Sequence, residues 1–148
     1  MSKVKEEVVS EYKNFDKYPK TKVKKGLAGL GLFADEDIKK GTYIVQYVGE
    51  KISNKIAAEK PNRYIFDLNT RWALDGSSRL NVARYVNHVC KIYNADSALD
   101  RGKIFYEANR NIKKGEEITT DYGEEYFEMY LKPAGCRCVS CKKDDKVV

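Results

Sequence analysis

Histidine, cysteine and long apolar runs are all scarce in this sequence. His88 is its one histidine, and no serine or cysteine arrangement around it suggests a catalytic triad. No stretch of about 18 apolar residues occurs, so we expect neither a membrane span nor a membrane partner. The Lys- and Glu-rich N-terminus lacks the apolar segment of a secretory signal, and we therefore expect an intracellular chain. The 148 residues, 42% of them hydrophobic, are enough for one domain with its own core.

The four cysteines are unevenly placed. Cys136, Cys138 and Cys141 lie close together near the C-terminus, whereas Cys90 is distant in the sequence. In an intracellular chain such cysteines are more often metal ligands than disulfide partners. A structural zinc takes four ligands, and Cys90 is the one thiol left for the fourth position. Two interpretations stay open: a Zn²⁺ site built from all four cysteines, or free thiols on a surface tail.

Positive charge is concentrated at the two ends of the chain. The net charge is +6, with eight lysines against four acids in residues 1–25 and five basic residues against two acids in residues 132–148. The body between them is close to neutral. The ends either keep a neutral domain soluble or act as basic arms that make weak contact with nucleic acid or an acidic surface.

Short β-rich runs dominate the middle of the chain. Residues 42–48, 63–68 and 103–108 are rich in β-branched and aromatic residues and predict strands. Two similar segments, residues 37–41 and 111–115, each end in Lys-Lys-Gly and predict tight turns whose glycine adopts positive φ. The sequence therefore predicts a mostly-β domain of many short strands.

Helical signals are few and short. Residues 53–60 predict one helix, with Ser53 or Asn54 as its N-cap and Pro61 after its end. Residues 124–131 place aromatic and apolar side chains at helical spacing and predict a second helix. Residues 1–20 are polar, with apolar side chains at roughly helical spacing, and predict a flanking helix or a loose arm.

Four motifs follow one another along the chain: residues 29–34 (GLGLFA), 87–90 (NHVC), 115–123 (GEEITTDYG) and the three C-terminal cysteines. Alone, the glycine segment is typical of a β-turn, and it lacks the third glycine of a dinucleotide-binding fingerprint. Together the motifs resemble a SET domain, the family of S-adenosylmethionine-dependent protein lysine methyltransferases. The resemblance spans roughly residues 22–142. It implies a β-clip-type fold with a C-terminal pseudoknot and divides the chain into a flanking arm (1–21), a SET domain (22–123) and a post-SET tail (124–148).

The resemblance implies a cofactor site. In the family, the glycine segment lies along the methionine part of S-adenosylmethionine. The Asn side chain of the Asn-His pair binds the cofactor's amino-acid end, and the His backbone recognises the adenine edge. By resemblance, these roles are assigned to the glycine segment, to the Asn87-His88 pair and to the nearby Tyr122. The sequence departs from the family where Val89 replaces a serine and where Asn94 lies one residue later than the family's asparagine. The expected cofactor-binding residues are Gly29, Leu30, Gly31, Asn87, His88 and Tyr122.

The resemblance also implies the catalytic residues. Tyr122 aligns with the family's catalytic tyrosine, and Tyr64 with a tyrosine that walls the lysine channel. Thr120 stands where the family carries Phe or Tyr, at a position that sets how many methyl groups are added. The smaller Thr leaves more room unless another tyrosine fills it. The alternative for Tyr122, as for most of the eleven tyrosines, is a core residue with a satisfied hydroxyl.

The implied chemistry suits this composition. A lysine amine, with a pKa near ~10.4, must lose its proton before it attacks a methyl group. An aromatic channel and a nearby positive sulfur both lower that pKa, so no strong general base is required. A Cys90 nucleophile paired with His88 is the competing chemistry, but it lacks a third orienting group.

The resemblance makes the four cysteines a post-SET zinc site that ties the tail to the active-site segment; no upstream cysteine cluster indicates a pre-SET module. It implies methylation of a histone tail or another basic, chromatin-associated protein. Asp121, Glu124 and Glu125 either attract such a substrate or begin a solvated helix. Two alternatives belong to other classes: a catalytically inactive SET-like interaction module stabilised by zinc, and a small basic zinc-binding protein that contacts nucleic acid.

Overall fold

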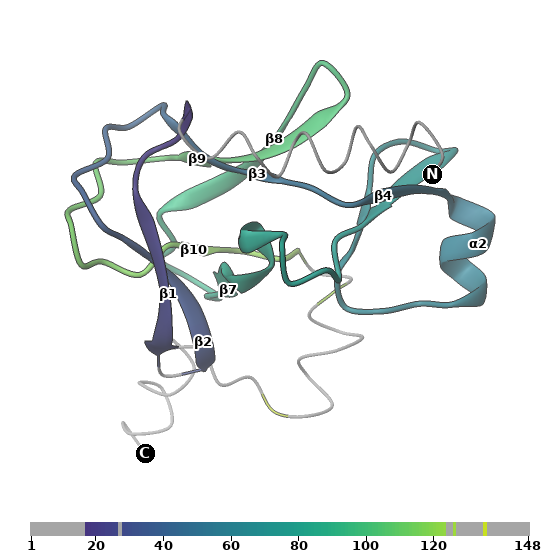
Figure 1. The fold of residues 1–148 in the computed structure, drawn as a ribbon, viewed down its shortest axis with the longest axis horizontal. Helices are drawn as coiled ribbons and strands as arrows, with labels where there is room; N and C mark the ends of the chain where they lie inside the picture. The colour runs from purple at the N-terminus through teal and green to yellow at the C-terminus, as the bar shows by residue number, and fades with distance from the viewer. Residues whose placement is uncertain (1–16, 27, 124–125, 127–134, 136–148) are drawn as a thin grey trace.

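The computed structural model describes residues 17–26, 28–123, 126 and 135, and within them the protein is mostly β, as predicted. The short strands form several small sheets (Figure 1). In chain order the elements are β1 (Thr21–Gly26), β2 (Gly29–Ala34), β3 (Tyr43–Tyr47), β4 (Glu50–Ser53), α2 (Asn54–Glu59), β5 (Ile65–Asp67), β6 (Trp72–Asp75), the 3₁₀ helix η2 (Val82–Tyr85), β7 (Asn87–His88), β8 (Ala95–Asp100), β9 (Lys103–Ala108) and β10 (Thr119–Thr120).

Three of the sheets are antiparallel and one is parallel. β1 and β2 form a hairpin, β6 lies between β4 and β5, and β9 lies between β3 and β8. β7 and β10 form a two-residue parallel pair, which joins segments more than 30 residues apart in sequence near the middle of Figure 1. The predicted strands at 42–48 and 103–108 are confirmed by β3 and β9, and the one at 63–68 by the shorter β5.

The core lies where the hairpin, the β3-β9-β8 sheet and η2 meet. Its fully buried side chains are aliphatic, among them Leu32 of β2, Ile44 of β3 and Ile104 of β9. Burying such a side chain contributes roughly 1.5–3 kcal/mol. Burial does not alternate strictly in β3, where the consecutive residues Ile44 and Val45 both join the core, because the register with β9 shifts between Tyr43 and Val45.

The predicted helix at 53–60 is confirmed as α2. The Ser53 hydroxyl accepts a hydrogen bond from the Ile56 N–H at 3.2 Å, which identifies Ser53 as the N-cap. The helix ends at Glu59, two residues before Pro61. The predicted helix over 124–131 and the arm over 1–20 lie almost entirely outside the described residues. None of the helices that the structure describes has the length and apolarity needed to cross a membrane.

The two similar turns pack against each other. Ile38 and Ile112 form an antiparallel bridge with N–H to carbonyl distances of 2.7 and 2.8 Å. Each turn also caps the other: Asn111 Oδ1 accepts from the Lys40 N–H, and Asp37 Oδ1 accepts from the Lys114 N–H, both at 2.9 Å. The prediction of positive φ is confirmed at Gly41 (86°) and Gly115 (95°).

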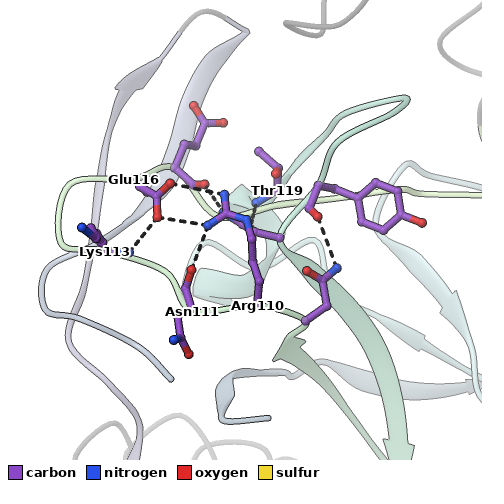
Figure 2. A network of polar contacts seen from close by, with 9 residues as sticks. Arg110, Asn111, Lys113, Glu116 and Thr119 are labelled. Carbon is purple, nitrogen blue, oxygen red and sulfur yellow. Dashed lines mark hydrogen bonds and ion pairs between the residues drawn. The ribbon is translucent and has the colours of Figure 1, made fainter. Parts of the chain in front are cut away.

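After this pair of turns, the segment that follows Gly115 runs along the edge of β2. The Gly115 N–H donates to the Ala34 carbonyl at 2.7 Å, and the Ile118 N–H donates to Leu32 at 2.8 Å. Figure 2 shows the polar contacts that hold the second turn: the Glu116 carboxylate binds the Arg110 guanidinium at 3.2 Å and accepts from the Lys113 N–H at 2.7 Å. The segment that follows leads directly to β10 and the candidate site.

Candidate active site

The Asn-His segment and the segment before Tyr122 are joined by more than the short β7-β10 pair. The Val89 N–H donates to the Thr120 carbonyl at 2.9 Å. The buried side chain of Asn94 fastens the same crossing, because its Oδ1 accepts from the Thr119 N–H at 2.9 Å and its Nδ2 donates to the Glu117 carbonyl at 2.8 Å. Asn94 therefore fixes the crossing that brings residues 87–88 beside residues 119–122.

His88 orients Tyr122. The Tyr122 N–H donates to His88 Nδ1 at 3.0 Å, so this nitrogen is an acceptor and the ring proton resides on Nε2. Nε2 lies 3.1 Å from the Cys90 sulfur. Burial lowers the pKa of His88, and the Asp121 carboxylate, 3.6 Å from Nδ1, partly opposes that effect. The lone histidine is thus a neutral ring that holds the backbone of the expected catalytic tyrosine.

Tyr122 lines a cavity of about 340 Å³ whose wall is rich in tyrosine. Its hydroxyl donates to the Val86 carbonyl, and its ring packs edge-on against Tyr126 at 4.7 Å between centroids. Burial raises the pKa of Tyr122 well above its usual range, so the hydroxyl stays protonated. The cavity is lined by five tyrosines, Tyr47, Tyr64, Tyr106, Tyr122 and Tyr126, together with Thr120.

Three of these tyrosines, Tyr47, Tyr106 and Tyr126, were not singled out from sequence as site residues. Tyr47 is buried, and its hydroxyl donates to the Tyr64 carbonyl at 2.6 Å. Tyr106 is 4% exposed and packs edge-on against Tyr47 at 6.3 Å. Both residues line the same cavity as Thr120, so the small threonine does not by itself define the size of the cavity. The inward positions of β3 and β9 were the available signal, but alternation does not distinguish a core tyrosine from a cavity tyrosine.

Charged groups of both signs also line the cavity. Its lining residues include the acidic Asp67 and Asp121 and the basic Arg63 and Arg84. The Arg84 guanidinium lies 4.2 Å above the Tyr64 ring and donates to the Ser77 carbonyl. Cation–π stacking of this kind holds the Tyr64 ring in place.

The glycine segment lies in β2, beside Asn87. The Asn87 amide donates to the Leu30 carbonyl at 3.1 Å. A Cβ atom at Gly31 would lie only 3.1 Å from the Asn87 Nδ2, so glycine permits this close approach. Leu30 itself is 54% exposed, and Gly29 has φ of 95° at the tip of the hairpin. Gly29, Leu30, Gly31 and Asn87 are therefore brought together, as His88 and Tyr122 are in the adjoining crossing.

The cysteines are only partly within the described structure. Cys90 is half-buried against His88, whereas Cys136, Cys138 and Cys141 lie outside the described residues. Across residues 17–26, 28–123, 126 and 135, no group of three or more His, Cys, Asp or Glu side chains is arranged to hold a metal ion. The zinc site stays a prediction.

Comparisons with known proteins agree with this geometry. A SET domain family model matches residues 29–123. The chain is 32% identical over 126 residues to the human histone-lysine N-methyltransferase EHMT1, covering 77% of this chain and 10% of that protein. It is 31% identical over 132 residues to the histone-lysine N-methyltransferase ASHH3 of Arabidopsis thaliana, covering 78% of this chain and 35% of the relative. The chain thus spans about a third or less of these relatives' lengths.

Solved structures show the same fold. An active polycomb repressive complex 2 in the stimulated state matches with a TM-score of 0.67 and 26% identity, over 83% of this chain and 18% of that one. The ctPRC2 complex in an autoinhibited conformation bound to S-adenosylmethionine matches with a TM-score of 0.63 and 28% identity, over 72% of this chain and 15% of that one. With the family model spanning most of the described residues, the chain belongs to the SET-domain family, whose relatives here are histone-lysine N-methyltransferases.

Proposed function

We propose that this chain transfers a methyl group from S-adenosylmethionine to the ε-amine of a lysine in a protein substrate. The observation that carries the proposal is the position of Tyr122. Its ring lines a tyrosine-rich cavity while His88 holds its backbone, next to the Asn87 that contacts the glycine strand. One short crossing therefore joins the tyrosine-rich cavity to the segment whose Asn87 contacts the glycine strand.

The residues around the glycine strand suit the cofactor. A Cβ atom at Gly26 or Gly31 would collide with the Glu117 or Asn87 side chain, so these glycines let two polar side chains lie against the strand, where a ligand would meet them together with the backbone. Leu30 and Gly31 would contact the methionine part, Asn87 would bind its amino-acid end and the backbone of His88 its adenine edge. The bound cofactor supplies the reactive methyl group.

The tyrosine cavity suits a lysine side chain in its neutral form. An aromatic, partly buried surrounding disfavours the ammonium form and lowers the pKa of the amine, so the proton leaves to solvent before transfer. Tyr64 and Tyr122 would align the amine, and alignment contributes up to about 7–11 kcal/mol to such reactions. The protonated hydroxyl of Tyr122 would then fix geometry without acting as a base.

A basic protein is the substrate class that fits best. The relatives are named as histone-lysine methyltransferases, and the acidic Asp67 and Asp121 are among the residues that line the cavity. Because Arg63 and Arg84 also line the cavity, the choice of a basic substrate rests mainly on the relatives, and a chromatin-associated setting in the nucleus follows from that choice. The basic ends of the chain would add weak contact with nucleic acid.

We propose zinc as a structural partner of the same site. Four thiolates form a donor set that Zn²⁺ prefers, and Cys90 lies beside the His88 ring that orients Tyr122. The post-SET tail from residue 124 would supply Cys136, Cys138 and Cys141 as the other ligands. Zinc would then hold the tail against one side of the lysine channel.

Calorimetry of S-adenosylmethionine binding to the zinc-loaded protein tests the proposal without knowledge of the substrate. We expect one-to-one binding that Asn87→Ala weakens. A well-folded protein that binds no cofactor would refute the enzyme assignment and favour a SET-like interaction module.

Tyr122→Phe tests the catalytic assignment. We expect it to keep cofactor affinity but to lower kcat on purified core histones by about a hundredfold, because a positioned hydroxyl is worth several kcal/mol in the transition state. Tyr43→Phe is the matched control, since its hydroxyl contacts Asp100 away from the cavity. Equal activity of the two variants would remove Tyr122 from the mechanism.

A further inference from the structure

The three glycines of the β1-β2 hairpin share one face. Gly26 is paired with Gly29, and Gly31 lies two residues further along β2. By strand alternation, these three positions lie on the same face of the hairpin. That face is turned toward the Glu117 side chain. A Cβ atom at Gly26 would lie 2.6 Å from Glu117 Oε1, and one at Gly31 would lie 3.1 Å from Glu117 Cδ. Gly26 and Gly31 therefore leave room for a carboxylate against the strand pair.

Glu117 is half-buried, and among the described residues its carboxylate accepts one hydrogen bond, from Asn87 Nδ2 at 3.2 Å. In the part of the chain that the structure describes, no cation forms an ion pair with it. Lys24 lies on the same face of the hairpin, but its ammonium sits over the Phe33 ring at 4.3 Å. A partly desolvated carboxylate without a counter-charge is costly unless a cationic ligand completes it.

Glu117 also determines how Asn87 is oriented. The two groups that face the Asn87 amide are the Leu30 carbonyl and the Glu117 carboxylate, and both are acceptors. Only the NH₂ side of the amide can bind two acceptors, so its carbonyl oxygen Oδ1 must point elsewhere. That oxygen is then available to accept a hydrogen bond from a ligand on the glycine face.

We propose that Glu117 recognises the α-ammonium group of S-adenosylmethionine, both by its own negative charge and by turning Asn87 Oδ1 toward the same ammonium. This inference rests on the proposed function and adds a residue to its cofactor site. The ligand chemistry is that of a primary ammonium close to a nucleoside sulfonium. A merely structural Glu117 would tie the hairpin to β7 without distinguishing one ligand from another.

The test compares ligands with and without the ammonium by calorimetry. S-adenosylmethionine and its demethylated thioether S-adenosylhomocysteine both carry the ammonium, whereas 5′-methylthioadenosine keeps the adenosine and a neutral thioether but lacks the amino-acid end. We expect Glu117→Gln, which preserves shape and removes charge, to raise the Kd for both S-adenosylmethionine and S-adenosylhomocysteine about tenfold or more, so that the sulfonium charge is not the cause. The Kd for 5′-methylthioadenosine should stay within about twofold of the wild-type value.

Glu116→Gln is the matched control, because Glu116 is the adjacent glutamate and its carboxylate binds Arg110 instead (Figure 2). It should change none of these Kd values. Equal loss for all three ligands in Glu117→Gln, or loss for none, would overturn the proposal. Should Glu117→Gln fail to fold, Glu117→Asp provides a second test. Because it retains the negative charge, it should keep the preference for S-adenosylmethionine over 5′-methylthioadenosine. Loss of that preference would contradict the proposal. Wild-type protein that binds no S-adenosylmethionine would instead refute the proposed function itself.

Discussion

Buried asparagines hold the loops around the candidate site. Asn81 is fully buried, and its Oδ1 accepts from the Val48 N–H at 3.1 Å while its Nδ2 donates to the Gly76 carbonyl at 3.0 Å. It therefore fastens the loop after β3 to the loop after β6. Asn94 does the same for the crossing at β10. Each side-chain amide pairs with backbone N–H and carbonyl groups that have no regular strand or helix partner in these irregular segments.

Asn81→Ala should destabilise the fold by about 2–3 kcal/mol, because it leaves a buried N–H and a buried carbonyl unpaired. Urea denaturation, followed by circular dichroism, measures the loss. The control is Asn69→Ala, whose exposed side chain accepts from the N–H groups of Arg71 and Trp72 in a turn. It should cost less than about 1 kcal/mol. Similar losses for both variants would show that burial of the Asn81 amide is unimportant.

At the scale of elements, the hairpin and the turn pair use glycine for different purposes. Gly31 is needed for space, since its missing Cβ lets Asn87 and Glu117 approach the strand. Gly41 is needed for conformation, since its φ is 86° while the space around it is open. The first requirement concerns the site and the second concerns the backbone, so the two positions should respond differently to the same substitution.

Gly31→Ala should weaken S-adenosylmethionine binding by about tenfold, because the new methyl group displaces the Asn87 amide. Gly41→Ala should instead cost about 1 kcal/mol of stability, because alanine disfavours positive φ, and it should leave binding unchanged. Calorimetry and thermal unfolding of both variants separate the two effects. Loss of binding in Gly41→Ala without unfolding would contradict this division.

At the scale of the whole molecule, remote segments converge on one crossing. The hairpin brings the glycine face, β7 brings Asn87 and His88, and β10 leads to Tyr122 (Figure 1). The proposed zinc would add the C-terminal tail to this assembly through Cys90. Metal binding of that kind couples to folding, because ligands far apart in sequence meet only in the folded chain.

Purified protein should contain about one zinc per chain, and Cys90→Ser should reduce that content and the thermal midpoint together. Metal analysis by mass spectrometry and thermal unfolding with and without a chelator provide the measurements. Ser140→Ala changes a neighbouring non-ligand in the same cysteine segment and serves as the control. Wild-type protein free of zinc after expression in zinc-supplemented medium would refute the metal site.

Local patterns in the sequence were enough to predict some of the elements. Runs rich in β-branched and aromatic residues predicted β3, β5 and β9, and the Ser53 cap predicted α2, because these features depend on neighbours within a few residues. The family was indicated by a resemblance, carried by the order of motifs along most of the chain. The site residues were predicted by resemblance, and their roles stay predictions. β5 proved shorter than its run because Arg63 and Tyr64 form a turn, in which the Tyr64 N–H donates to Asn62 Oδ1 at 2.8 Å.

Only the tertiary structure decided which side chains surround the site. Nothing local distinguishes Glu117 from Glu116, yet one carboxylate faces the glycine strand and the other pairs with Arg110. Likewise, Tyr47 and Tyr106 read as ordinary strand tyrosines until β3 and β9 pair. The physical reason is that these roles arise from contacts between residues tens of positions apart. Such contacts are set by packing and by hydrogen-bond satisfaction across the whole chain.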